Sequence, residues 1–129
     1  MAAWGEGPFE NDEGMDLLVQ LVKAFERERE QRIRSALLLP AGHVARSSAR
    51  TALAAAALVA AANGMPSLAP PEAEHVLRAG GIPVDEETRR TARTALTRVS
   101  AASEWRDGEE EVGLLPDVQK VVDGIGFYL

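Results

Sequence analysis

The stretch ARTALAAAALVAAANG, residues 49–64, decides the fold of this protein. Nine of the residues from Ala49 to Ala62 are alanines. Alanine has the highest helix propensity, and its small side chain lets neighbouring helices approach closely. We therefore expect residues 44–63 to form the central, most buried helix of the molecule. Asn63 and Gly64 are typical residues for its C-terminal end.

Before this stretch, apolar residues keep helical spacing behind two residues that can cap a helix, Asn11 and Asp12. The expected apolar stripe consists of Leu18, Leu21, Val22 and Phe25. A charged run follows, in which Glu28/Arg32 and Glu30/Arg34 have the spacing of intrahelical ion pairs. The pattern leaves open whether residues 12–39 form one long helix or two.

After the alanine-rich stretch, proline and glycine divide the chain into further helical segments. We expect a short helix from Pro71 to about Ala79, a longer one from a capping Asp85 to about Trp105, and a last one beginning near Pro116. No segment shows sustained alternation of apolar and polar residues. The sequence therefore predicts an all-α fold, a compact bundle of five or six helices in a single domain over residues 1–129.

Composition excludes several classes of function. The chain has 129 residues, of which 46% are hydrophobic and 26% charged, as in an ordinary globular domain. It has no cysteine, which rules out thiolate metal sites and disulfides. The net charge of -6 opposes general attraction to nucleic acid or anionic lipid, so we expect neither as a partner.

No part of the sequence has the pattern of a membrane segment or a secretory signal. The longest apolar stretch, residues 52–62, is much shorter than the roughly twenty residues that a spanning helix needs. The first basic residue is Lys23, whereas a secretory signal begins with positive charge. We expect a cytoplasmic protein with no membrane association.

Nine consecutive residues near the N-terminus form a distinctive motif: Trp4, Gly5, Glu6, Gly7, Pro8, Phe9, Glu10, Asn11 and Asp12. This motif closely resembles the opening signature of a small bacterial family, the domain of unknown function 4259. The resemblance implies an architecture and a location in the cell. It implies no reaction, and no catalytic residue is carried over from the family.

Read physically, the motif is suited to docking the N-terminal segment onto the bundle. Turn-forming residues, large apolar side chains and capping residues occur together in Trp4, Gly5, Gly7, Pro8, Phe9, Asn11 and Asp12. The alternative is an anion or ligand pocket, because backbone amides at a helix start attract negative charge. Four nearby carboxylates would repel an anionic ligand, so we favour the structural interpretation.

No catalytic, cofactor-binding or metal-binding residues are assigned. A divalent cation held by Glu10, Asp12 and Asp16 is conceivable, but these residues do not have the spacing of an EF-hand calcium loop. Glu72 and His75 form a Glu-x-x-His pair, but di-iron bundles need this unit twice. We expect His75 and the other histidine, His43, to be surface residues, and we favour a role that is not enzymatic.

Charge patterning is the remaining feature with functional content. Arginines are concentrated in the segment after Asp85 and in the start of the alanine-rich segment, but no aromatic residues interleave with them, as they do on single-strand nucleic-acid surfaces. Further along the chain, an acidic segment from Asp107 to Glu111 follows Trp105. Its candidate interaction residues are Trp105, Asp107, Glu109, Glu110 and Glu111.

Two hypotheses about function follow. The first is a protein-interaction module that masks or regulates a basic partner, whose identity the sequence does not name. The alternative is a small-ligand binder or enzyme with a pocket lined by Trp4, Phe9 and the carboxylates near Asp12. A flat acidic patch with exposed apolar residues would favour the first, and a cavity of several hundred cubic ångströms with converging polar groups would favour the second.

We predict that Trp4→Ala lowers stability. A buried indole contributes roughly 3 to 5 kcal/mol to the free energy of unfolding, whereas a lost helix cap costs about 1 kcal/mol. The melting temperature of Trp4→Ala should therefore fall further than that of Asp12→Ala. A Trp4→Ala protein as stable as the parent would contradict the structural interpretation and make the N-terminal motif the first candidate for a binding site.

Overall fold

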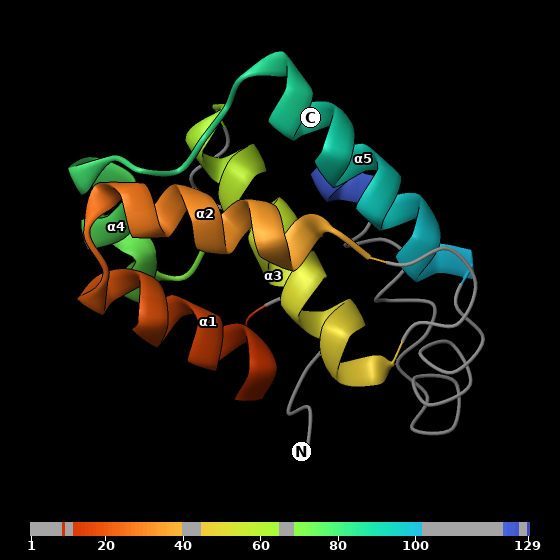
Figure 1. Cartoon of the computed structure of the whole chain (residues 1–129), viewed down its shortest axis with the longest axis horizontal. Coiled ribbons are helices and arrows are strands. Elements are labelled where there is room, and N and C mark those ends of the chain that lie inside the picture. The colour runs from red at the N-terminus through yellow and green to blue at the C-terminus, as the bar shows by residue number, and fades with distance from the viewer. Residues whose placement is uncertain (1–8, 10–11, 40–44, 65–68, 102–122, 127–128) are drawn as a thin grey trace.

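Helices occupy the segments in which the sequence has helical spacing. The computed structural model describes residues 9, 12–39, 45–64, 69–101, 123–126 and 129. Its elements are α1 (Asp12–Lys23), α2 (Glu26–Leu37), α3 (Arg46–Ala62), the 3-10 helix η2 (Pro71–Ala73), α4 (Glu74–Ala79) and α5 (Glu86–Ala101). Residues 123–126 are helical as well, and no strand occurs among the residues described. The prediction of an all-α fold is confirmed (Figure 1).

Residues 12–39 form two helices rather than one. After Lys23 the backbone amide of Ala24 donates to the carbonyl of Leu21 at 3.2 Å, which closes the last turn of α1. Phe25 then adopts an extended conformation, with φ -74 and ψ 164. Its carbonyl accepts the first hydrogen bond of α2, from the amide of Arg29 at 2.9 Å.

This break makes part of the predicted apolar stripe wrong. Leu18 and Leu21 are buried as expected, but Val22 is 41% exposed and Phe25 is 81% exposed. The helical path ends at Lys23, so the spacing that would have turned Phe25 inward does not continue. Ala24 takes the buried position instead.

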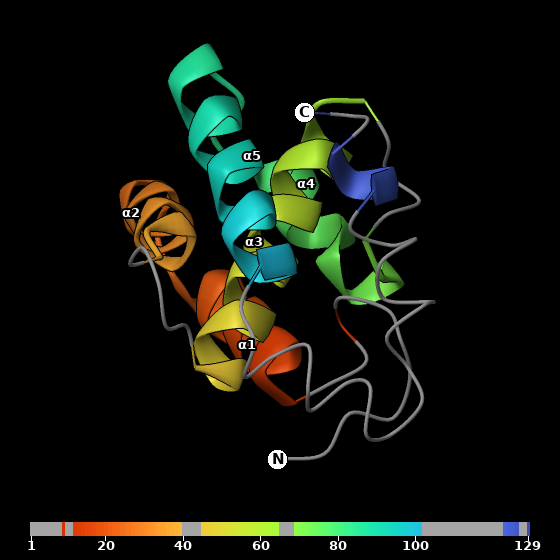
Figure 2. The same ribbon diagram turned by 90° about the vertical axis from the view of Figure 1, so that its right-hand side faces the viewer.

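The alanine-rich helix α3 supplies much of the core. It packs against α1, α2, α4 and α5. In Figure 1 α2 crosses in front of α3, and in Figure 2 α2 and α4 lie to either side of it. Every residue from position 52 to 60 is at most 3% exposed. Small side chains along this helix allow the other backbones to come close, as expected for alanine.

The predicted helix ends agree with the structure where it describes them. Asn63 follows α3 as its C-cap, and Gly64 has a φ of +131, a conformation that favours glycine. Gly80 ends α4 in the same way. Asp85 caps α5, because its carboxylate accepts a hydrogen bond from the amide of Thr88 at 3.2 Å.

Parts of the last two predicted helices lie outside the described residues. α5 is described as far as Ala101, so its predicted extension to Trp105 stays a prediction. Of the helix predicted from Pro116, the structure describes the helical residues 123–126 and Leu129. Ile125 in this segment is fully buried.

The charged pairs predicted within α2 are replaced by links to other helices. Arg32 Nη1 donates to Gln20 Oε1 of α1 at 3.1 Å instead of pairing with Glu28. Arg34 Nη2 lies 3.4 Å from Asp85 Oδ1 at the start of α5. α2 packs against α1 and α5, and the long arginine side chains reach acceptors on those neighbours.

Arg29 holds the junction between α1, α2 and the segment after α4. Its side chain is buried within the charged run, where the sequence pattern does not distinguish it from its neighbours. Arg29 Nε donates to the carbonyl of Leu21 at 2.9 Å, and Nη1 donates to the carbonyl of Gly80 at 3.2 Å. A buried cation is stabilised by such charge-assisted bonds to backbone carbonyls.

We predict that Gly81→Ala destabilises the protein by roughly 2 to 4 kcal/mol, from backbone strain together with overpacking. Gly81 has a φ of +86, and a Cβ there would lie 3.0 Å from the carbonyl oxygen of Glu26 and 3.1 Å from Arg29 Cβ. Gly124→Ala is the control, because its Cβ would meet nothing within 4 Å. Urea unfolding should show a loss for Gly81→Ala alone.

We also predict that part of the stability depends on pH through Asp85. A hydrogen bond from the Thr88 hydroxyl, at 2.6 Å, lowers the pKa of Asp85 below its ordinary value. A lowered pKa in the folded state stabilises the protein above the unfolded pKa of about 3.9, and this contribution is lost as the pH falls through the folded value. Unfolding curves should therefore show a stability difference between the parent and Asp85→Ala at neutral pH that shrinks below pH of about 4. A difference independent of pH would contradict this.

Candidate functional site

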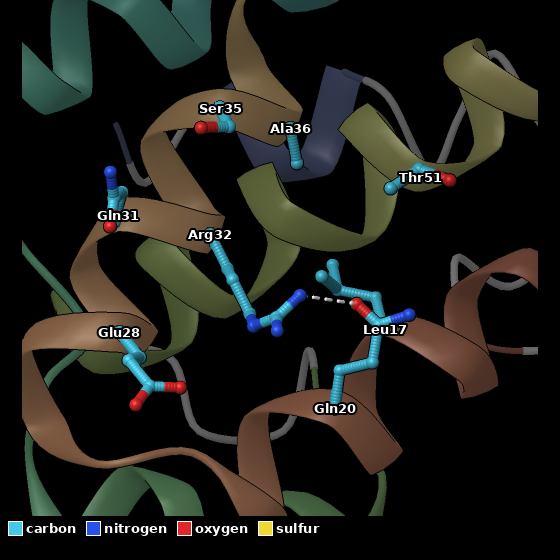
Figure 3. Close-up of a pocket in the computed structure, with 8 residues that line it drawn as sticks. All are labelled: Leu17, Gln20, Glu28, Gln31, Arg32, Ser35, Ala36 and Thr51. Carbon is cyan, nitrogen blue, oxygen red and sulfur yellow. Dashed lines mark hydrogen bonds between the residues drawn. The ribbon is translucent and has the colours of Figure 1, made fainter.

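An open groove lies between α1, α2 and the first turns of α3. Its volume is about 600 Å³. The residues that line it are Leu17, Gln20, Glu28, Gln31, Arg32, Ser35, Ala36 and Thr51 (Figure 3). Six of these eight side chains are polar, so the groove combines hydrogen-bonding groups with apolar surface.

Helical spacing in α2 explains why the groove is polar on one wall. Glu28, Gln31 and Ser35 recur at intervals of three and four residues and therefore share one face of the helix. Ile33 and Leu37 lie on the other face and are buried in the core. The groove remains open because the residues facing α3 at this end of α2 are small, as Ser35 and Ala36 illustrate.

Some of the polar side chains of the groove are paired within the protein and others are not. Arg32 extends from α2 toward α1 and donates to Gln20 Oε1 at 3.1 Å (Figure 3). Thr51 Oγ1 donates to the carbonyl of Ser47 within α3. Across the described part of the chain, the side chains of Glu28 and Gln31 form no hydrogen bond, so both are free to bind a ligand.

A second hollow continues the groove toward the end of α2. It has a volume of about 250 Å³ and shares Ser35, Ala36 and Thr51 with the first. Its other lining residues are Leu38, Leu39, Ser47 and Ser48. Leu38 is 70% exposed, which places an apolar side chain beside a row of hydroxyl groups. Together the two hollows form an elongated groove, a shape that suits a chain-like ligand.

A buried ion pair ties the start of α1 to α3. Arg50 Nη1 lies 3.8 Å from Glu13 Oε2, and both side chains are largely buried, at 6% and 13% exposure. Breaking one side of a buried pair leaves an uncompensated charge, so the pair fixes α1 on α3 directly after the N-terminal motif. The sequence carries no signal for this pair, because Glu13 and Arg50 are far apart in the chain and come from different helices.

The N-terminal motif itself is described only in part. Phe9 is buried in the core, and Asp12 is the first residue of α1. Trp4, Gly5, Gly7, Pro8 and Asn11 lie outside the described residues. The acidic candidates, Trp105, Asp107, Glu109, Glu110 and Glu111, lie outside them as well, so their predicted role stays a prediction.

The family model described as domain of unknown function (DUF4259) matches residues 2–120. The chain belongs to this family. Neither a curated protein nor a solved structure matches it. The resemblance predicted from the N-terminal motif is therefore confirmed.

The histidine and carboxylates of this DUF4259 chain do not gather into a metal centre where the structure describes them. His75 is exposed on α4, in a separate open hollow of about 520 Å³ that also contains Glu72, Glu74 and Arg78. Glu74 pairs with Arg78 at 2.6 Å. Within the described ranges no group of three or more metal-ligating side chains occurs. His43 and Glu10 lie outside those ranges.

Several arginines of α5 hold other parts of the fold. Arg93 donates to the backbone oxygen of Leu129, and Arg98 donates to the carbonyl of Leu39. Arg90 pairs with Glu86 at 3.2 Å on the helix surface. These guanidinium groups are therefore used within the domain. None of the helices from α1 to α5 combines the length and apolar character of a bilayer-spanning segment.

Proposed function

We propose that this DUF4259 chain is a protein-interaction module whose groove binds an extended segment of a partner polypeptide. The observation that carries the proposal is the lining of the groove, in which the Gln31 amide and the Ser35 hydroxyl form no side-chain hydrogen bond with the described residues and lie beside Leu17 and Ala36. Side chains of this kind both donate and accept hydrogen bonds, as peptide groups do.

The second hollow supports a chain-like ligand rather than a compact one. It extends the groove past Ser35 and adds the hydroxyl groups of Ser47 and Ser48 beside exposed Leu38. An extended peptide would place peptide groups against the hydroxyls and an apolar side chain against Leu38. Interfaces of this type combine a small apolar centre with a polar rim.

Charge favours a partner segment with a basic side chain. Arg32 already donates to Gln20, whereas Glu28 has no ion pair among the described residues and is exposed at the groove. The net charge of -6 would also attract a basic partner over a distance. The acidic segment containing Asp107 and Glu109 to Glu111 would add to this attraction as a second part of the same proposal.

A small polar ligand is the second candidate. The volume of about 600 Å³ is within the usual range of ligand pockets. Such pockets enclose most of their ligand, whereas this groove is open. The alternative site near Trp4 and Phe9 remains a separate hypothesis, and the groove supplies no nucleophile with an adjacent base for an enzymatic role.

The proposal is tested with peptides selected by display against the full chain. We expect selected peptides to contain a basic residue and to lose about tenfold or more in affinity for Glu28→Lys and for Ser35→Tyr, which fills the groove. Glu87→Lys on α5 is the matched control, since it makes the same charge change outside the groove. Isothermal titration calorimetry gives the affinities.

The melting temperature of each variant shows whether it is folded. Glu28 and Ser35 are exposed positions of α2, so both variants should melt close to the parent. Failure to enrich any peptide would contradict the proposal. So would peptides that bind Ser35→Tyr as tightly as they bind the parent.

A further inference from the structure

Exposed apolar side chains are concentrated on the outer side of α1 and the turn that follows it. Of the five large hydrophobic residues exposed in the described part of the chain, three lie within residues 19–25. They are Val19 at 47%, Val22 at 41% and Phe25 at 81% exposure. Apolar side chains grouped on one exposed face are a candidate interaction surface.

Two opposite charges flank this apolar face. Asp16 and Lys23 are both exposed, and they lie seven residues apart, so they occupy nearly the same side of α1 two turns from each other. Val19 lies between them along the helix. Neither charge forms an ion pair among the described residues, so both are available to a partner.

We propose that this face of α1 binds the same face of a second copy of the chain, with the two helices antiparallel. A two-fold axis across α1 between Val19 and Gln20 would bring Asp16 of each copy opposite Lys23 of the other. The two Val19 side chains would meet at the axis. A two-fold interface must be complementary to itself, and an acid and a base placed symmetrically about an apolar centre meet that condition.

The polarity of the helix supports the antiparallel arrangement. Asp16 is toward the N-terminal half of α1 and Lys23 is in its last turn. Parallel copies would place Asp16 beside Asp16 and Lys23 beside Lys23. Antiparallel copies pair Asp16 with Lys23 twice, and their helix dipoles also point in opposite directions, which is favourable. Phe25, just beyond Lys23, extends the apolar surface over the first half of the other copy's helix.

The same features make other occupants less suitable. One acid and one base give the face no preference for an acidic or a basic partner, and the net charge of -6 opposes an anionic membrane. Three exposed apolar side chains form a small surface, so the dimer should be weak and dependent on concentration. The inference does not rest on the peptide groove, which is lined by Leu17 and Gln20 on the adjacent side of α1.

Charge reversal tests the proposed pairing. The full chain should show a monomer–dimer equilibrium in sedimentation experiments over a range of concentrations. Asp16→Lys would place lysine opposite lysine, and Lys23→Asp would place aspartate opposite aspartate. We expect each variant alone to raise the dimer dissociation constant about tenfold or more. An equimolar mixture of the two should dimerise again, because every contact then joins a lysine to an aspartate.

Two further variants separate this geometry from other forms of association. Val19→Ser should weaken the dimer, and Glu87→Lys, a charge reversal on α5, should leave it unchanged. All of these positions are exposed, so melting temperatures should stay close to the parent value. A chain that is monomeric at every concentration would overturn the proposal. A dimer that is insensitive to Asp16→Lys, or a mixture that fails to dimerise, would overturn it too.

Discussion

Close packing against α3 is the constraint on which the rest of the structure depends. Six of its nine residues from 52 to 60 are alanine and all nine are buried, so α1, α2, α4 and α5 can all pack directly against one helix. Larger side chains at these positions would push the neighbouring helices outward, because protein interiors leave little free volume. The groove depends on the same packing, since its walls are α1 and α2 and its end is formed by Thr51 of α3.

Buried and half-buried arginines then hold these helices at their ends. Arg29 joins the end of α1 to the backbone at Gly80, and Arg98 reaches the carbonyl of Leu39 after α2. Arg50 pairs with Glu13 at the start of α1. An alanine helix offers few interactions that distinguish one neighbour from another, and directional bonds from guanidinium groups to specific oxygens supply that distinction.

The candidate sites differ in how far sequence reasoning reached them. The N-terminal motif was recognised as a family signature, and its match to DUF4259 over residues 2–120 confirms the family. The groove was not predicted, because Gln20, Glu28 and Thr51 come from three helices and have no common spacing in the sequence. The exposed face of α1 was missed for a related reason. Periodicity assigned Val22 and Phe25 to the core, but Val22 lies on the outer side of α1 and the break after Lys23 leaves Phe25 exposed.

The sequence by itself determined the elements that depend on local chemistry. Alanine propensity set α3, Asp85 set the start of α5, and Gly64 and Gly80 set helix ends, because each acts through its own backbone or nearest turn. Tertiary structure decided how the charges are used. Arg32 and Arg34 have ideal partners one turn away but bind Gln20 and Asp85 on other helices. Exposed intrahelical pairs contribute only a few tenths of a kcal/mol to stability. A hydrogen bond or ion pair to a neighbouring helix can therefore replace them.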